Sequence, residues 1–183
     1  MKTAFVFLAS GFEEIEAMSI IDVLRRGEVN TVTVSITGDK KVKGAHNVEV
    51  IADEIFTNVD FSNGDMLVLP GGMPGTNHLN AHDGLKSVIS EYNNQGKYIA
   101  AICAAPLVFG EMGLLKGKKA TCYPSFEDRL IGAEVTENER VVVDGNVVTS
   151  RGPGTAIEFA LQLVEILVSK EVAAQWRAGM LVK

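Results

Sequence analysis

The organisation of this chain is best approached from one stretch, Tyr98-Ile99-Ala100-Ala101-Ile102-Cys103-Ala104-Ala105-Pro106. The apolar run at 98–102 predicts a buried strand, and a helix is expected over 105–112. A cysteine between a buried strand and a helix has the position of a nucleophile elbow, in which a tight turn lifts the reactive atom above a sheet. The neighbouring alanines are small enough for such a turn. We therefore expect Cys103 at the carboxyl end of a central strand.

Short apolar runs alternate with helical patterns on both sides of this stretch. The predicted strands are 4–9, 31–36, 66–69, 118–122 and 141–149, with a hairpin over 41–50; the predicted helices are 13–26, 81–95, one that starts at Thr155 and a short one around Trp176. This alternation predicts an α/β fold, a mainly parallel sheet with helices on both faces. Capping boxes are expected from Ser10 with Glu13 and from Thr155 with Glu158. One domain over 1–183 fits the length.

Composition excludes several classes of protein. The chain is 46% hydrophobic, carries a formal net charge of −6 and shows dispersed charges without a basic stripe, which argues against nucleic-acid binding. No run approaches the ~20 apolar residues that span a bilayer. Its two cysteines, Cys103 and Cys122, are too few for a disulfide framework and favour a reducing, cytoplasmic location. Neither they nor the three histidines have metal-ligand spacing, so no metal or cofactor is expected.

Three segments leave carboxyl strand ends with unusual chemistry: 10–16, 71–75 and 103–106. Ligands of such sheets bind at these ends, near a topological switch point. The helix after Cys103 would aim amides at the sulfur and lower the thiol pKa. A buried, inert cysteine is the alternative. Gly71 and Gly72 fit neither GxGxxG nor a phosphate loop; their N–H groups could hold an oxyanion, or the pair could simply form a tight turn.

Glu16 falls one turn into the first predicted helix. Close to a thiolate, its carboxyl would keep a proton and donate a hydrogen bond to sulfur. The alternative is a solvated first-turn acid favoured by the helix dipole, which is the interpretation we give to Glu13 and Glu14.

Several motifs, in order, resemble the ThiJ/PfpI superfamily, and within it the deglycase and glyoxalase III-like branch named for a parkinsonism-associated protein. These motifs are Gly11-Phe12-Glu13-Glu14-Ile15-Glu16, Leu69-Pro70-Gly71-Gly72, Ala100-Ala101-Ile102-Cys103-Ala104-Ala105-Pro106, Thr149-Ser150-Arg151-Gly152-Pro153-Gly154-Thr155 and Lys170-Glu171-Val172-Ala173-Ala174-Gln175. The match runs nearly from end to end, so the motifs together are far more specific than any one of them.

The resemblance implies a flavodoxin-like three-layer sandwich and a homodimer with the first helix at its interface. It implies that Cys103 is the nucleophile and Glu16 its protonated partner, with Gly72 and Ala104 as backbone donors to an oxyanion. Arg26 and Arg151 match family arginines near the interface and the site. The substrates implied are small reactive dicarbonyls such as methylglyoxal, or their early adducts on proteins and nucleotides; some members act as oxidant sensors or chaperones.

The chain departs from the family at three positions. Tyr123 stands where a histidine is common, and Ala104 stands where the protease-like branch has histidine after the nucleophile. Both changes argue against a peptidase, which needs a base beside the thiol. His46 occupies a hairpin position where some relatives have arginine; it is either a residue that reaches the partner's site or a plain surface histidine. Cys122 is interpreted as a buried bystander, since a resolving role needs close approach of two sulfurs.

The sequence therefore predicts a cofactor-independent cysteine enzyme that converts dicarbonyls to 2-hydroxy acids. The alternative is an oxidative-stress sensor or holdase chaperone that uses oxidation of Cys103. Intracellular peptidase or amidase activity is the weakest of the three hypotheses.

Overall fold

A seven-stranded sheet in the order β10-β11-β7-β6-β1-β2-β5 forms the middle layer of the computed structural model, which describes all residues 1–183. Its strands are β1 Thr3–Leu8, β2 Asn30–Ser35, β5 Glu54–Ile55, β6 Met66–Leu69, β7 Tyr98–Ile102, β10 Val141–Asp144 and β11 Val147–Ser150. Every pairing is parallel except that of β10 with β11. The chain builds outward from β1 through β2 on one side and through β6 on the other, so the switch point lies between β1 and β6.

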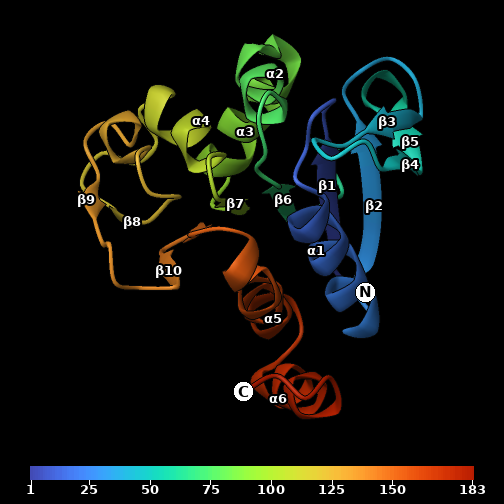
Figure 1. Cartoon of the computed structure of the whole chain (residues 1–183), viewed down its shortest axis with the longest axis vertical. Helices are drawn as coiled ribbons and strands as arrows, with labels where there is room; N and C mark the ends of the chain where they lie inside the picture. The colour runs from blue at the N-terminus through green and yellow to red at the C-terminus, as the bar shows by residue number, and fades with distance from the viewer.

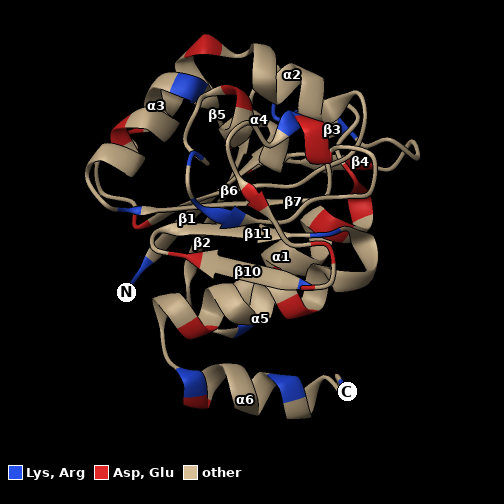
Figure 2. Cartoon of the chain, turned by 90° about the vertical axis from the view of Figure 1, so that its left-hand side faces the viewer, with Lys and Arg blue, Asp and Glu red and all other residues tan.

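Helices cover both faces of this sheet, as Figures 1 and 2 show. One outer layer contains α2 Gly75–Ala81, α3 Asp83–Asn94 and α4 Pro106–Glu111, and the other contains α1 Glu14–Arg26 and α5 Ala156–Leu167, with α6 Lys170–Gly179 packed outside α5. One apolar face of α1 is buried against the sheet and α5, and it consists of Ala17, Ile20, Ile21, Val23 and Leu24. Ile15 and Met18 of the same helix are exposed. The mainly parallel sheet with helices on both faces, predicted from the alternation of strands and helices, is confirmed.

Two small sheets lie outside the main one. The hairpin of β3 Lys41–Lys43 and β4 Glu49–Ile51 is antiparallel, as predicted, whereas β8 Lys119–Ala120 pairs with β9 Glu134–Val135. The prediction of a strand over 118–122 was therefore wrong in extent. The predicted strand over 141–149 is instead the hairpin β10–β11, because Gly145 turns the chain with a φ of 60°. Single helical turns occur at η1 Phe56–Asn58, η2 Glu127–Arg129 and η3 Pro153–Thr155.

The helix starts differ from the predicted ones. The predicted helix over 81–95 is confirmed as α3, which His82 caps by accepting the backbone N–H of Leu85, whereas α2 before it was not predicted. Glu13, not Ser10, caps α1, because the chain still turns at Gly11 with a φ of 84°. The Thr155 hydroxyl accepts the N–H of Gly152 within η3, so it forms no capping box with Glu158. Both predicted capping boxes were wrong.

No helix of the chain combines the length and the apolar character needed to cross a bilayer. Lys and Arg are interspersed with Asp and Glu along the helices and strands (Figure 2). This distribution agrees with the dispersed charge of the sequence.

Candidate active site around Cys103

Cys103 lies in a strained turn at the carboxyl end of β7. Its φ is 64°, in the left-handed region that non-glycine residues rarely adopt. The turn is held by its own peptide groups: the Cys103 N–H donates to the carbonyl of Ser150 at 3.0 Å, and the Cys103 carbonyl accepts the N–H of Tyr123 at 2.8 Å. Such strain persists only where surrounding structure imposes it, and it concentrates at functional sites. The nucleophile-elbow geometry predicted from the sequence is present.

Glu16 projects from the first turn of α1 and is fully buried. Its Oε2 accepts the N–H of Gly71 at 2.8 Å, while Oε1 has no hydrogen-bond partner. The carboxyl and the Cys103 thiol are close enough for each to shift the pKa of the other. A Cβ at Gly71 would lie 2.6 Å from Cys103 Cβ and 2.8 Å from Glu16 Oε2. Glycine at this position therefore lets the segments that follow β1, β6 and β7 meet.

Burial raises the pKa of Glu16 to about 7, although the Gly71 N–H and the thiol act against it. Burial also raises the pKa of Cys103, and a charged Glu16 raises it further. The lowered thiol pKa expected from the sequence was therefore wrong: α4 has only 6 residues, and burial outweighs the nearby amides. A proton on Glu16 removes one of the two main causes that raise the thiol pKa, and burial remains, so the two groups titrate as a coupled pair.

Two backbone amides face the sulfur. The N–H groups of Ala104 and Gly72 both interact with it and favour the thiolate. Gly72 has a φ of 93°, and a Cβ there would lie 2.3 Å from the backbone nitrogen of Glu13. The structure thus brings together the two amides that the sequence analysis associated with an oxyanion, and that role stays a prediction.

Tyr123 and Arg151 lie beside the turn. With Arg140, they line a cavity of about 240 Å³. The backbone N–H of Tyr123, one of these lining residues, donates to the Cys103 carbonyl. Arg151 lowers the pKa of the neighbouring Cys122, but burial raises it to about 12. Cys122 is a free thiol, 1% exposed.

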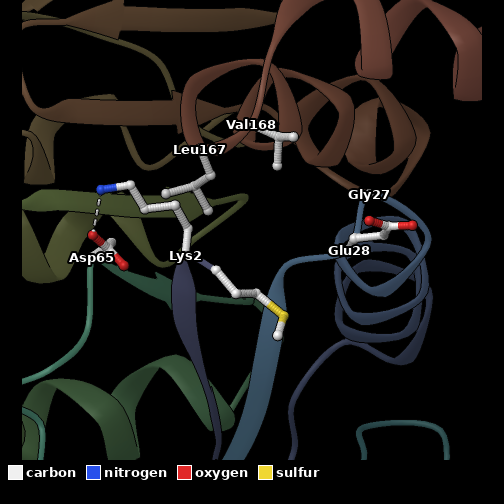
Figure 3. A pocket seen from close by; sticks show the side chains of 7 residues that line it. Lys2, Gly27, Glu28, Asp65, Leu167 and Val168 are labelled. Atoms are coloured by element: carbon white, nitrogen blue, oxygen red, sulfur yellow. Dashed lines mark hydrogen bonds and ion pairs between the residues drawn. The ribbon is translucent and has the colours of Figure 1, made fainter.

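Arg26 is not brought to Cys103 within the chain. It pairs with Asp22 at 2.6 Å and lies 5.5 Å from the ring centroid of Trp176, at the opposite end of α1 from Glu16. The largest cavity, about 680 Å³, is also at that end of the sheet (Figure 3). It contains the 2.7 Å ion pair of Lys2 with Asp65, which fastens the starts of β1 and β6. Lys2 supplies its only side-chain amine, and that amine is engaged in the ion pair with Asp65, so the size of the cavity does not make it the active site.

The sequence analysis missed a network at the rim of the site. Glu14 was expected to be a solvated acid, but it is 9% exposed. Its Oε1 accepts the backbone N–H of His46, and its Oε2 lies 2.8 Å from the Nδ1 of His46. Glu13, whose side chain is 12% exposed, lies 3.7 Å from the same Nδ1. One carboxylate oxygen from each of Glu13 and Glu14 and one ring nitrogen of His46 lie within 4.8 Å of one another. Glu14 is hydrogen-bonded to the hairpin through both carboxylate oxygens, and Glu13 adds a second negative charge beside the ring.

Comparison with known protein families matches residues 2–166 to the DJ-1/PfpI family. The chain belongs to the DJ-1/PfpI family. Protein dj-1beta of Drosophila melanogaster is 38% identical over 182 residues, which are 99% of this chain and 97% of that protein. The crystal structure of Drosophila DJ-1beta covers 100% of this chain and 98% of its own with a TM-score of 0.96, which confirms the flavodoxin-like fold.

Two further relatives bear on function and length. Protein DJ-1 homolog B of Arabidopsis thaliana is 41% identical over 95% of this chain, but the chain spans only 40% of that protein. A glutathione-independent glyoxalase of Caenorhabditis elegans is 32% identical over 93% of this chain and 91% of its own length. Glyoxalase activity therefore occurs among its relatives in the DJ-1/PfpI family.

Proposed function

We propose that this chain is a cofactor-independent enzyme that converts small reactive dicarbonyls, or their early adducts, to 2-hydroxy acids with Cys103 as nucleophile. The observation that carries the proposal is the buried Cys103–Glu16 pair, in which a cysteine in a strained turn lies beside a carboxyl whose pKa burial raises to about 7. A group that titrates near neutrality can both accept and return a proton. The glyoxalase among the relatives supports the same chemistry.

The reaction with methylglyoxal follows from this pair. The Cys103 sulfur bonds to the aldehyde carbon, and the thiol proton passes through Glu16 to the carbonyl oxygen, which gives a hemithioacetal. The Gly72 and Ala104 amides stabilise the developing alkoxide. Glu16 then moves the proton of the former aldehyde carbon to the adjacent carbon, and the hydroxyl proton of the hemithioacetal passes to the ketone oxygen. The first carbon is thereby oxidised to a thioester and the second is reduced to a carbon that bears a hydroxyl group. Water cleaves the resulting thioester, releasing lactate, one proton and the free thiol.

The test is lactate formation from methylglyoxal by purified wild type and by Cys103→Ser, without glutathione. We expect turnover in the wild type and only the spontaneous rate in the variant. Turnover that survives in Cys103→Ser would exclude the mechanism.

A redox sensor or chaperone is the second candidate. The unpartnered Oε1 of Glu16 beside Cys103 favours it, because a neutral carboxyl could donate to a sulfinate oxygen. Mild peroxide followed by mass spectrometry tests it. Addition of two oxygens at Cys103 without dicarbonyl turnover supports the sensor, and an unoxidised Cys103 opposes it.

A peptidase has less support, because it needs a base beside the thiol. No histidine is among the groups that shift the pKa of Cys103.

We also propose a homodimer in the cytoplasm. Exposed apolar side chains gather on α1 and the β3–β4 hairpin, namely Ile15, Met18, Val48 and Ile51. Apolar clusters of this kind favour burial against a partner, and a second copy would cover them. Light scattering of the purified chain should give twice the monomer mass; a monomer at micromolar concentration would contradict the dimer.

A further inference from the structure

The peptide groups of Cys103 are held from both sides by the end of one strand. The Cys103 N–H donates to the carbonyl of Ser150, the last residue of β11, at 3.0 Å. The Cys103 carbonyl accepts the N–H of Tyr123. The segment that carries Tyr123 is tied to β11 as well, because the Thr121 N–H donates to the hydroxyl of Thr149 at 3.0 Å. Both bonds that fix the left-handed turn therefore depend on the last two residues of β11.

Ser150 is fixed in turn by a chain of hydroxyl groups. Its Oγ donates to the carbonyl of Arg140 at 2.7 Å and lies 2.7 Å from the Oγ1 of Thr155. The Gly152 N–H donates to the same Oγ1 at 3.1 Å, and the Gly152 carbonyl is a second acceptor for the Thr155 proton at 2.9 Å. Because the single hydroxyl proton of Ser150 is directed at a carbonyl, Thr155 donates in the bond between the two hydroxyls. The chain thus runs in one direction, from the Gly152 N–H through Thr155 and Ser150 to the Arg140 carbonyl.

Burial makes this hydroxyl chain difficult to replace. Ser150 is 0% exposed and Thr155 is 6% exposed, so solvent does not supply substitute partners. Loss of the Thr155 hydroxyl would leave the Gly152 N–H without its acceptor and the Ser150 hydroxyl without its donor. A buried polar group without a partner is strongly destabilising, and hydrogen bonds in a chain strengthen one another. The end of β11 would therefore shift to recover partners, and the carbonyl that holds Cys103 would shift with it.

The turn at Cys103 needs such support because the strand pairing ends just before it. The register of β7 with β11 stops at Ile102 opposite Ser150, and the φ of Cys103 is 64°. A non-glycine residue keeps this conformation only where its surroundings impose it. We propose that the hydroxyl chain of Thr155 and Ser150 holds Cys103 in its left-handed turn and so keeps the sulfur against Glu16 and the two amides. Its effect on turnover rests on the proposed function. Both are positioning residues that act through the Ser150 carbonyl and do not touch the reacting atoms.

Three variants separate this role from a general loss of stability. Thr155→Val removes the hydroxyl and keeps the shape of the side chain, whereas Thr155→Ser keeps the hydroxyl. Thr31→Val is the matched control. Thr31 is 7% exposed, and its hydroxyl donates to the Val29 carbonyl at 3.0 Å near the start of β2, at the edge of the sheet opposite Cys103. The control therefore loses a buried hydroxyl bond of the same kind without altering the turn.

The first measurement does not depend on turnover. Amide hydrogen exchange, followed by NMR, reports directly on the Cys103 N–H that bonds the Ser150 carbonyl. In Thr155→Val this N–H should exchange at least ~10-fold faster than in Thr31→Val, while the N–H of Ala100 in the middle of β7 exchanges alike in both. Thr155→Ser should restore the slow exchange. Equal exchange at Cys103 in Thr155→Val and Thr31→Val would overturn the proposal.

The second measurement is steady-state turnover of methylglyoxal by the same proteins. We expect kcat of Thr155→Val to fall ~10-fold with KM unchanged, because the reacting groups no longer meet in the productive arrangement. Thr155→Ser and Thr31→Val should stay within about twofold of the wild type. A wild-type kcat in Thr155→Val would overturn the proposal. Faster exchange at Cys103 in Thr155→Val, together with a wild type that does not turn over methylglyoxal, would support the positioning role and contradict the dicarbonyl function instead.

Discussion

The two cysteines of this chain are both free and both buried, yet their surroundings differ. Cys103 occupies a left-handed turn against the Glu16 carboxyl and two amides, whereas Cys122 follows the short strand β8 and has Arg151 as its only opposing cation. Burial raises the pKa of both thiols. Burial alone therefore does not distinguish them. The difference is an acid that can take the proton, and the predictions below test that difference.

The largest effect is expected from removing the acid. Glu16→Gln keeps the side-chain volume but cannot accept the thiol proton, so kcat/KM on methylglyoxal should fall ~10²-fold. In the wild type, kcat/KM should rise with pH through about 7, as the pair loses its first proton. The variant should lack that inflection. Steady-state rates from pH 5.5 to 8.5 measure both, and an unchanged inflection in Glu16→Gln would assign it to another group.

The same substitution should alter how stability depends on pH. The folded protein holds a proton on Glu16 up to about pH 7, whereas the ordinary value is 4.5. The folded state therefore binds more protons between these values, and stability falls as pH rises through this window. The loss amounts to about 3 kcal/mol. Relative to wild type, Glu16→Gln should gain stability from pH 5 to pH 8 in urea unfolding; a constant difference would show that Glu16 does not titrate there.

A smaller effect is expected from crowding the pair. The methyl group of Gly71→Ala would push Cys103 away from Glu16, so we expect a loss of ~10-fold in kcat. Gly179→Ala is the matched control, since its nearest neighbour is an ordinary 3.9 Å contact with Trp176. Both variants are assayed after a check of folding by circular dichroism. Equal activities would mean that the contact between thiol and acid does not govern the rate.

The smallest effect is expected at Tyr123. Its backbone N–H holds the Cys103 carbonyl, and its side chain is 46% exposed. Tyr123→Phe leaves the backbone bond in place, so kcat should stay within about twofold of wild type. A loss of the size seen in Glu16→Gln would show that the hydroxyl transfers a proton.

The features of this structure that were predicted correctly from the sequence are those that depend on local sequence pattern. The apolar run before Cys103 and the glycines after β6 predicted a parallel sheet with three segments meeting at its carboxyl edge, and the structure has them there. The helical period also placed Glu16 close enough to the strand end to reach the thiol.

The remaining features depend on contacts between distant segments. Glu14 is buried because the hairpin, more than thirty residues away, closes over it. The break at His82 arises when its ring accepts a backbone N–H, which competes with a continuous helix. The raised pKa of Cys103 comes from burial by elements on both sides of the sheet, which a local helix argument does not include.

The most direct test labels both cysteines in one sample. Wild-type protein is treated with limiting iodoacetamide at pH 7.5, and peptide mass spectrometry measures alkylation at Cys103 and Cys122. If the shared proton with Glu16 makes Cys103 the reactive thiol, its labelling should exceed that of Cys122 at least ~10-fold, and Glu16→Gln should reduce the ratio. Equal labelling of the two cysteines, or faster labelling of Cys122, would contradict the account.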